Sequence, residues 1–66
     1  MNIELRFLQK AIEDKNYISF SYEQKNIIKI QPLKLVQENE NYTLYTENKV
    51  FEFKKIKKLQ ILKERY

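Results

Sequence analysis

The sequence predicts a mainly β domain with one N-terminal helix. From residue 17 onward, apolar and polar residues alternate in short runs, which is typical of strands with one buried face. These runs are rich in isoleucine, threonine and aromatic residues, which favour strands. Helical spacing of apolar residues is confined to the first 15 residues. We expect a single domain, residues 1–66, with a core of aliphatic and aromatic side chains.

Residues 2–15 are predicted to form the helix. Leu5, Leu8 and Ile12 fall on one face, because residues three and four apart lie next to each other on a helix. Asn16 follows, and asparagine tolerates the left-handed conformation that often ends a helix. A helix this short is marginal alone, so we expect it to pack on the strands.

The first predicted strand spans residues 17–23. Its aliphatic and aromatic residues alternate, which places Ser19 and Ser21 together on the opposite face. A turn is predicted at residues 24–26, where Asn26 best tolerates a positive φ.

A long second strand is predicted over residues 27–36. Ile28 and Ile30 are expected to face inward. Pro32 cannot donate a backbone hydrogen bond, so the strand should bend there. A long bent strand allows a small barrel to turn a corner and close.

The last three strands are predicted at residues 41–46, 49–53 and 59–61. The first two form a hairpin, because the alternation breaks at two polar residues between them. Residues 54–57 are too few for an α-helix and fit one 3₁₀ turn, with Ile56 pointing inward.

One helix and five short strands, with a bent second strand and a 3₁₀ turn before the fifth, predict a five-stranded SH3-like or Sm-like barrel. Phe20, Leu44 and Phe53 are expected to converge in its core. The alternative is a ferredoxin-like sheet, which would need a second helix, and no helical period follows residue 16.

Several segments, taken in order, resemble those of the WYL domain family. Residues 8–12 resemble a helix end of the form L-x-x-A-I, and residues 18–22 resemble the strand I-x-F-x-Y. Residues 30–35 are similar to V-x-P-L-x-L. Residues 42–44, Tyr-Thr-Leu, stand where the family has Trp-Tyr-Leu, and residues 51–56 stand where F-R-L-D-R-I is usual. The resemblance covers nearly the whole chain.

The resemblance implies an Sm-like barrel that serves bacterial transcriptional regulators as an accessory domain. Such a domain is expected to sense a nucleotide or single-stranded nucleic acid and to report to a DNA-binding domain. The chain would then be either a piece of a longer regulator that carries this DNA-binding domain on the same full-length chain or a stand-alone version. Four positions depart from the family. Tyr42 replaces a tryptophan and preserves an amphipathic aromatic side chain, Thr43 removes an aromatic side chain, and Glu52 reverses the charge of an arginine. Lys55 keeps the charge of a second arginine without its planar fork.

The composition argues against several classes of protein. The chain has no cysteine, histidine or glycine, so thiolate and imidazole metal ligands and glycine-rich phosphate loops are absent. No carboxylate pair is spaced for acid–base catalysis, and we expect no enzyme, cofactor or metal site. No apolar run approaches the ~20 residues of a membrane span, and no signal peptide is visible. We therefore expect a cytoplasmic protein without a membrane partner.

Positive charge is concentrated in the second half of the chain. The net charge is +4, of which residues 34–66 contribute eight basic and five acidic side chains, or +3. A run of four lysines in five residues is the best candidate for phosphate contact, and Tyr45 is the best candidate for base stacking. The candidate ligand-binding residues are Tyr45, Lys49, Lys54, Lys55, Lys57 and Lys58.

Two alternatives stay open at this point. The lysine run could be a solvated surface, because the abundance of lysine, asparagine and isoleucine also arises from an AT-rich coding sequence. The domain could also be a protein–protein interaction module without a ligand, in which exposed strand edges pair in a homodimer. Glu52 and Thr43 favour this second class, because they remove a cation and an aromatic side chain that the family's ligand site has at these positions.

Overall fold

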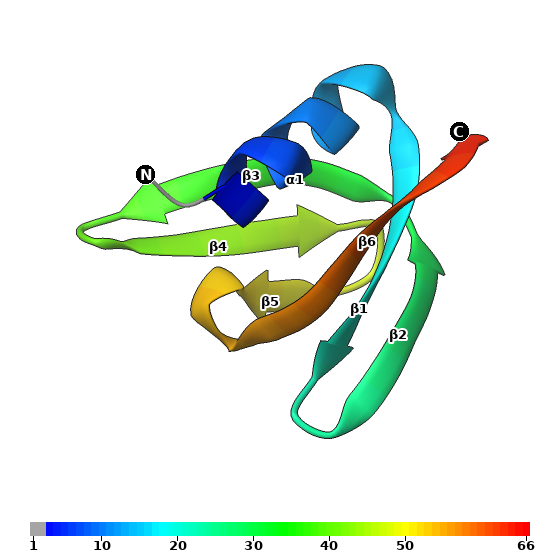
Figure 1. Cartoon of the computed structure of the whole chain (residues 1–66). Coiled ribbons are helices and arrows are strands. Elements are labelled where there is room, and N and C mark those ends of the chain that lie inside the picture. The colour runs from blue at the N-terminus through cyan, green and yellow to red at the C-terminus, as the bar shows by residue number, and fades with distance from the viewer. Residues whose placement is uncertain (1–2) are drawn as a thin grey trace.

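The computed structural model describes residues 3–66, and it is mainly β with one N-terminal helix, as predicted (Figure 1). Six strands form two antiparallel sheets of three strands, with the orders β2-β1-β6 and β3-β4-β5. The elements are α1 Ile3–Asp14, β1 Asn16–Tyr22, β2 Lys25–Ile30, β3 Pro32–Glu38, β4 Asn41–Thr46, β5 Val50–Glu52, the 3₁₀ turn η1 Phe53–Lys55, and β6 Ile56–Arg65.

The predicted long bent strand is present as two strands in different sheets. β2 ends at Ile30 and β3 begins at Pro32, whose side chain is buried at the junction. At the other end, the chain passes from β5 to β6 through η1, and no ladder joins these two strands within residues 3–66. Neither sheet closes on itself, so the prediction of a closed five-stranded barrel is not confirmed.

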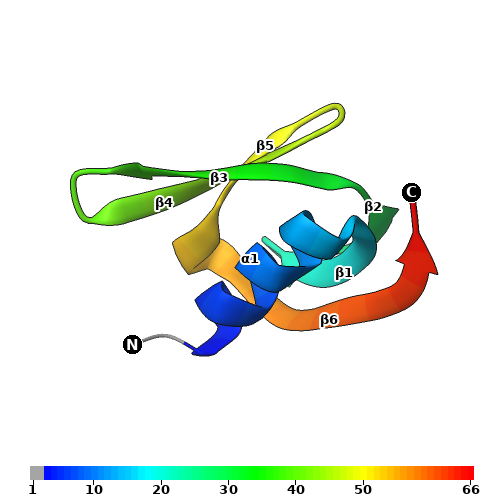
Figure 2. The same ribbon diagram turned by 90° about the horizontal axis from the view of Figure 1, so that it is seen from above.

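Helix α1 packs between the two sheets, with β3 on one side and β1 and β6 on the other (Figure 2). Leu8 and Ala11 are fully buried, and Ile12 packs at the edge of the core. The predicted first residue, Asn2, lies outside the described residues. Lys15 takes the left-handed conformation after the helix, with φ 59°, where Asn16 was expected to do so. Asn16 instead begins β1.

The core lies where the helix and both sheets meet. Phe20 and Leu44 are buried there, as predicted. The third predicted member, Phe53, is half-buried and packs against this core from its edge, because it begins η1 and the chain leaves the strand at that residue. Phe51 lies inside the core, directly opposite Leu44 in the ladder and with its ring centroid 5.0 Å from that of Phe20.

The hairpin between β1 and β2 turns one residue earlier than predicted. Glu23 and Gln24 both have a positive φ, at 49° and 66°. A two-residue turn with this conformation matches the right-handed twist of the flanking strands. Asn26 is therefore a strand residue opposite Ser21, and its prediction as the turn residue is wrong.

A β-bulge at Lys29 changes which side chains of β2 face the core. Lys29 has φ 53°, and its backbone N–H donates to the Ser19 hydroxyl at 2.9 Å. The register shifts there, so Ile27 and Ile30 both face the core. Ile28 was predicted to face inward, but it is 68% exposed. Ile27 lies opposite Phe20 in the ladder, so Ile28 points outward by ordinary alternation. The extra residue at Lys29 then turns Ile30 inward, and alternation counted back from Ile30 predicts the wrong direction for Ile28.

β6 is longer than the predicted fifth strand and begins directly after η1 at Ile56. Ile56 is buried, as predicted. The 3₁₀ turn ends at Lys55, so Lys57 and Lys58 belong to the strand and not to the turn. Lys58 has φ 55°, and the pairing with β1 shifts register around it. This second bulge controls the direction of the neighbouring side chains.

Candidate anionic-ligand site

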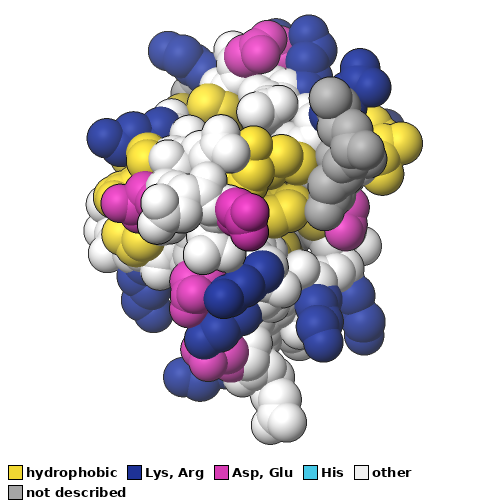
Figure 3. All heavy atoms as spheres, turned by 90° about the vertical axis from the view of Figure 1, so that its left-hand side faces the viewer, with side chains coloured by type: hydrophobic (Ala, Val, Ile, Leu, Met, Phe, Trp, Pro, Cys, Tyr) yellow, Lys and Arg dark blue, Asp and Glu magenta, His cyan; other side chains and the backbone are white. Residues whose placement is uncertain are grey.

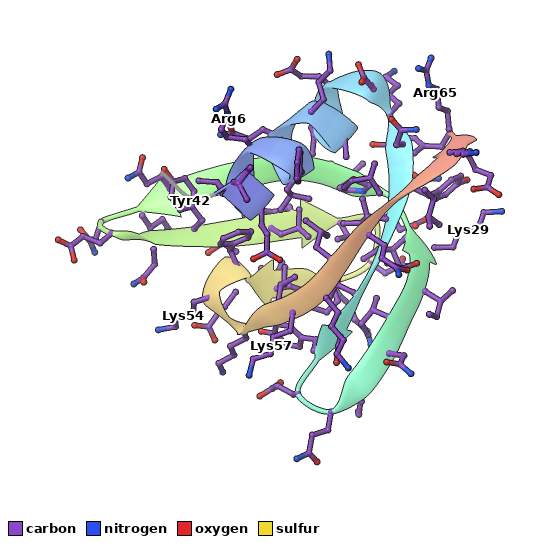
Figure 4. The ribbon with its side chains drawn as sticks, in the orientation of Figure 1. Arg6, Lys29, Tyr42, Lys54, Lys57 and Arg65 are labelled. Carbon is purple, nitrogen blue, oxygen red and sulfur yellow. The ribbon has the colours of Figure 1, made fainter. Side chains whose placement is uncertain are left out.

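The predicted site residues lie in three places. Lys54 and Lys57 project from one corner of the molecule, formed by η1 and the start of β6 (Figure 4). Lys49 lies in the connection between β4 and β5 and lines a separate cleft. Tyr45 lies on β4, and the Lys34 ammonium covers its ring at 4.9 Å from the centroid. The structure therefore groups the four-lysine run and leaves Tyr45 and Lys49 apart from it.

Carboxylates pair with two of the four lysines at this corner, Lys54 and Lys55. Glu52 contacts Lys55 at 3.0 Å and Lys54 at 3.9 Å, and Glu23 contacts Lys55 at 3.7 Å. A hydrogen bond and the charge of Lys55 lower the pKa of Glu52, and the same contact with Glu52 raises the pKa of Lys55. Acidic and basic side chains alternate on the lower part of the face in Figure 3. Lys54 and Lys55 are therefore less available to an anion than the sequence indicates.

Lys57 and Lys58 differ from the other two lysines of the run. Neither makes an ion pair with residues 3–66. Lys57 lies opposite Ser21 in the ladder between β1 and β6, and Gln60 lies opposite Ser19. Directly opposed residues of an antiparallel pair project to the same side. Lys57 and Gln60 are therefore on the outer face of the sheet, with the two serines of β1.

A hollow of about 170 Å³ lies on this outer face beside the lysines. Serines are small, so the longer side chains of β2 and β6 form its rim. The Ser21 hydroxyl has no hydrogen-bond partner within the described chain, whereas the Ser19 hydroxyl accepts from Lys29. The hollow is lined by Ser19, Phe20, Ser21, Asn26, Ile28, Lys58 and Gln60.

The arrangement offers three kinds of contact to a ligand. Lys58 supplies a cation, and Ser21, Asn26 and Gln60 supply neutral hydrogen-bonding groups. Ile28, which points outward just before the bulge, supplies an apolar surface. Sequence reasoning missed the non-lysine members of this set. The available signal was the pair of serines on the outward face of β1, but their neighbours depend on the strand pairing.

A second cluster of aromatic and basic residues has a structural role. Figure 4 shows Lys29 and Arg65 on the side of the molecule opposite Lys54. The Tyr17 and Tyr66 rings meet edge to face at 5.4 Å, and the Tyr66 hydroxyl donates to the carbonyl of Pro32. Burial raises the pKa of Tyr66, with smaller contributions from Glu47 and Tyr17. The hydrogen bond of this tyrosine connects the end of β6 to the junction of the two sheets.

The remaining observations concern metals, membranes and related proteins. Residues 3–66 contain no group of three acidic, histidine or cysteine side chains that could hold a metal ion. In the same part of the chain, α1 is too short and too polar to cross a bilayer. Comparison of the chain with protein-family models, curated proteins and solved structures found no match.

Proposed function

We propose that this chain is a WYL-like sensor module that binds an anionic ligand, a nucleotide or a single-stranded nucleic acid, without catalysing a reaction. The observation that carries the proposal is the position of Lys57 and Lys58. They are adjacent cations without carboxylate partners in the described chain, beside a polar hollow. Phosphate contacts by such side chains fix a nucleic acid in place and carry no sequence information.

The strand order supports the assignment to this class. If β2 and β3 are counted as one bent strand, the five strands run in the order 4-3-2-1-5, as in an open SH3-like or Sm-like barrel. The sequence segments that resemble the WYL family follow the same order. In this proposal, the module belongs to a bacterial transcriptional regulator in the cytoplasm and passes its signal to a DNA-binding domain.

The contacts on the outer face suit one phosphate and the sugar or base attached to it. Lys57 and Lys58 neutralise the phosphate, and the Ser21 hydroxyl and Gln60 amide accept or donate hydrogen bonds. Ile28 provides an apolar surface for a ribose or base. Tyr45 contributes less than the sequence indicates, because Lys34 already covers its ring.

The test is binding of a fluorescein-labelled single-stranded oligonucleotide, followed by fluorescence anisotropy over a range of salt concentrations. With two phosphate contacts, log affinity should fall against log salt with a slope of roughly −1.4, from about −0.7 per contact. The double variant Lys57→Gln/Lys58→Gln should lose this slope and bind all sequences about equally weakly.

The control of equal charge is Arg6→Gln/Lys10→Gln, which removes two positive charges from α1. Arg6 lies away from Lys57 in Figure 4, and Lys10 pairs with Asp14 on the same helix at 3.6 Å. This control should retain the wild-type slope. Equal losses in the two double variants would mean that net charge alone determines binding, and the proposed site would then be wrong. Absence of salt-dependent binding in the wild-type protein would have the same consequence.

A homodimerisation module remains the second candidate. It is favoured by Ile3 and Phe7, which are 63% and 53% exposed on α1. The free edge of β6 argues against pairing of strand edges, because lysines on an edge strand oppose it. Sedimentation separates the two candidates: a dimer that binds no oligonucleotide or nucleotide would support the second.

A further inference from the structure

A second cleft lies between β2 and the connection from β4 to β5, away from the outer-face hollow. It consists of two adjoining cavities of about 140 and 230 Å³. Both are lined by Ile27, Lys49 and Phe51. The first cavity continues to Ile30, and the second continues to Val50. The cleft runs along the seam where the two sheets face each other without a hydrogen-bonded ladder.

The floor of the seam is apolar and held in place by aromatic packing. Phe51 is 5% exposed, and its ring meets those of Phe20 and Tyr22 edge to face at 5.0 and 4.9 Å. The backbone N–H of Glu52 donates to the Tyr22 hydroxyl at 3.1 Å, which ties β5 to the end of β1. A cleft fixed in this way loses little conformational entropy when a ligand enters it.

The charged residues at the rim are not equivalent. Two acidic side chains are already engaged: Glu23 contacts Lys55 at 3.7 Å, and Glu47 accepts from the backbone N–H of Gln31 at 3.1 Å. Lys25 and Lys49 make no ion pair with residues 3–66, and both are exposed. Glu47 keeps its negative charge, because its partner is a neutral backbone N–H. The rim therefore presents Lys25 and Lys49, two cations outside any ion pair of residues 3–66, together with this one carboxylate above an apolar floor.

We propose that the seam binds a small amphipathic anion, with a flat aromatic body on the Ile27 and Phe51 floor and a carboxylate or phosphate between Lys25 and Lys49. An apolar cavity with a few polar groups at its rim is the usual form of a small-molecule site. A strand from a second chain fits less well, because the outward N–H of Glu52 on β5 is already bonded to Tyr22. This inference does not depend on the proposed function.

The probe is 2-naphthoate, titrated into ¹⁵N-labelled protein and followed by amide chemical shifts. The neutral 2-naphthamide has the same aromatic body and is the ligand control. Naphthoate should shift the backbone amide signals of Ile27, Lys49 and Phe51. It should also bind more tightly than 2-naphthamide. The double variant Lys25→Gln/Lys49→Gln should weaken naphthoate about three- to tenfold and leave naphthamide unchanged, since each exposed charge contact contributes modestly.

The control variant is Lys57→Gln/Lys58→Gln, which removes the same charge from the outer face and should leave naphthoate binding unchanged. This comparison also separates the two proposals, because loss of oligonucleotide binding in that variant does not bear on the seam. Equal affinity for naphthoate and naphthamide would overturn the proposal. Shifts confined to the amides of β6, or self-association through β2 and β5 that naphthoate does not alter, would overturn it as well.

Discussion

Neutralising Glu52 should strengthen binding of anions at the corner formed by η1 and β6. Glu52 holds Lys55 at 3.0 Å and Lys54 at 3.9 Å, so it competes with any phosphate for both lysines. The substitution Glu52→Gln keeps the shape of the side chain and removes its charge. The backbone N–H of residue 52 keeps its hydrogen bond to Tyr22, so the connection between β5 and β1 is preserved.

The size of the effect follows from the number of cations released. Lys57 and Lys58 alone predict a salt slope of roughly −1.4 for a single strand, and two further contacts would bring it to roughly −2.8. Each exposed contact is weak, and the pair should tighten binding about two- to thirtyfold at low salt. Glu23 still contacts Lys55 at 3.7 Å, which places the expected gain toward the lower end.

Fluorescence anisotropy with the labelled oligonucleotide measures both the affinity and its salt slope. Glu38→Gln is the matched control. Glu38 is an exposed carboxylate at the end of β3 that makes no ion pair with residues 3–66, and its loss changes the net charge equally. Circular dichroism verifies that both variants fold. If Glu52→Gln gains no more than Glu38→Gln, Lys54 and Lys55 do not contact the ligand, and the reasoning about the corner is refuted.

Two further predictions concern stability. Ile27→Ala should lower the free energy of unfolding by about 1–2 kcal/mol, because this side chain packs on the core. Ile28→Ala should change it by no more than about 0.5 kcal/mol, because this side chain is exposed. Urea unfolding would measure both values, and the reverse order would contradict the bulge at Lys29. Tyr66→Phe should cost roughly 0.5–1.5 kcal/mol, because it removes the hydrogen bond from the Tyr66 hydroxyl to the Pro32 carbonyl. The pKa of Tyr66 is raised from 10.0, so the stability that its neutral hydroxyl contributes is present below pH 10 and is lost as pH rises through the folded-state pKa. Tyr66→Phe should therefore lose less stability at alkaline pH than the wild-type protein.

Alternation along the chain was sufficient to predict most of the strands. It placed Phe20 and Leu44 in the core, and the 3₁₀ turn predicted at residues 54–57 placed Ile56 there; all three are buried. The failures come from residues with a positive φ that their type does not signal. Lysine has no preference for this conformation, yet Lys29 and Lys58 adopt it in strands. A bulge at such a position reverses the direction of the side chains beyond it, and alternation alone does not reveal this.

The candidate site was predictable to the extent that it is local in sequence. The lysine run is visible directly, and the contact between Glu52 and Lys55 spans three residues across one tight turn. The contact of Lys55 with Glu23 depends on the β1–β2 hairpin. The proximity of Ser21 to Lys57 depends on the pairing of β1 with β6, which no local pattern specifies.

The two bulges, at Lys29 and Lys58, are not predictable from alternation, and they also determine which side chains lie on the outer face. Around Lys58, the register shift leaves Lys57 opposite Ser21 while Lys58 itself lines the hollow, so two successive cations serve one face of the sheet. Around Lys29, the shift turns Ile30 into the core while Ile28 keeps its outward direction toward the same hollow, and the backbone N–H of Lys29 donates to the Ser19 hydroxyl. In a regular ladder, alternation would have sent one of the two lysines to the opposite face, and Ile28 and Ile30 would have shared one face. The two adjacent cations on this sheet face therefore result from a local departure from regular β structure, and bulges next to binding sites commonly serve to redirect side chains in this way.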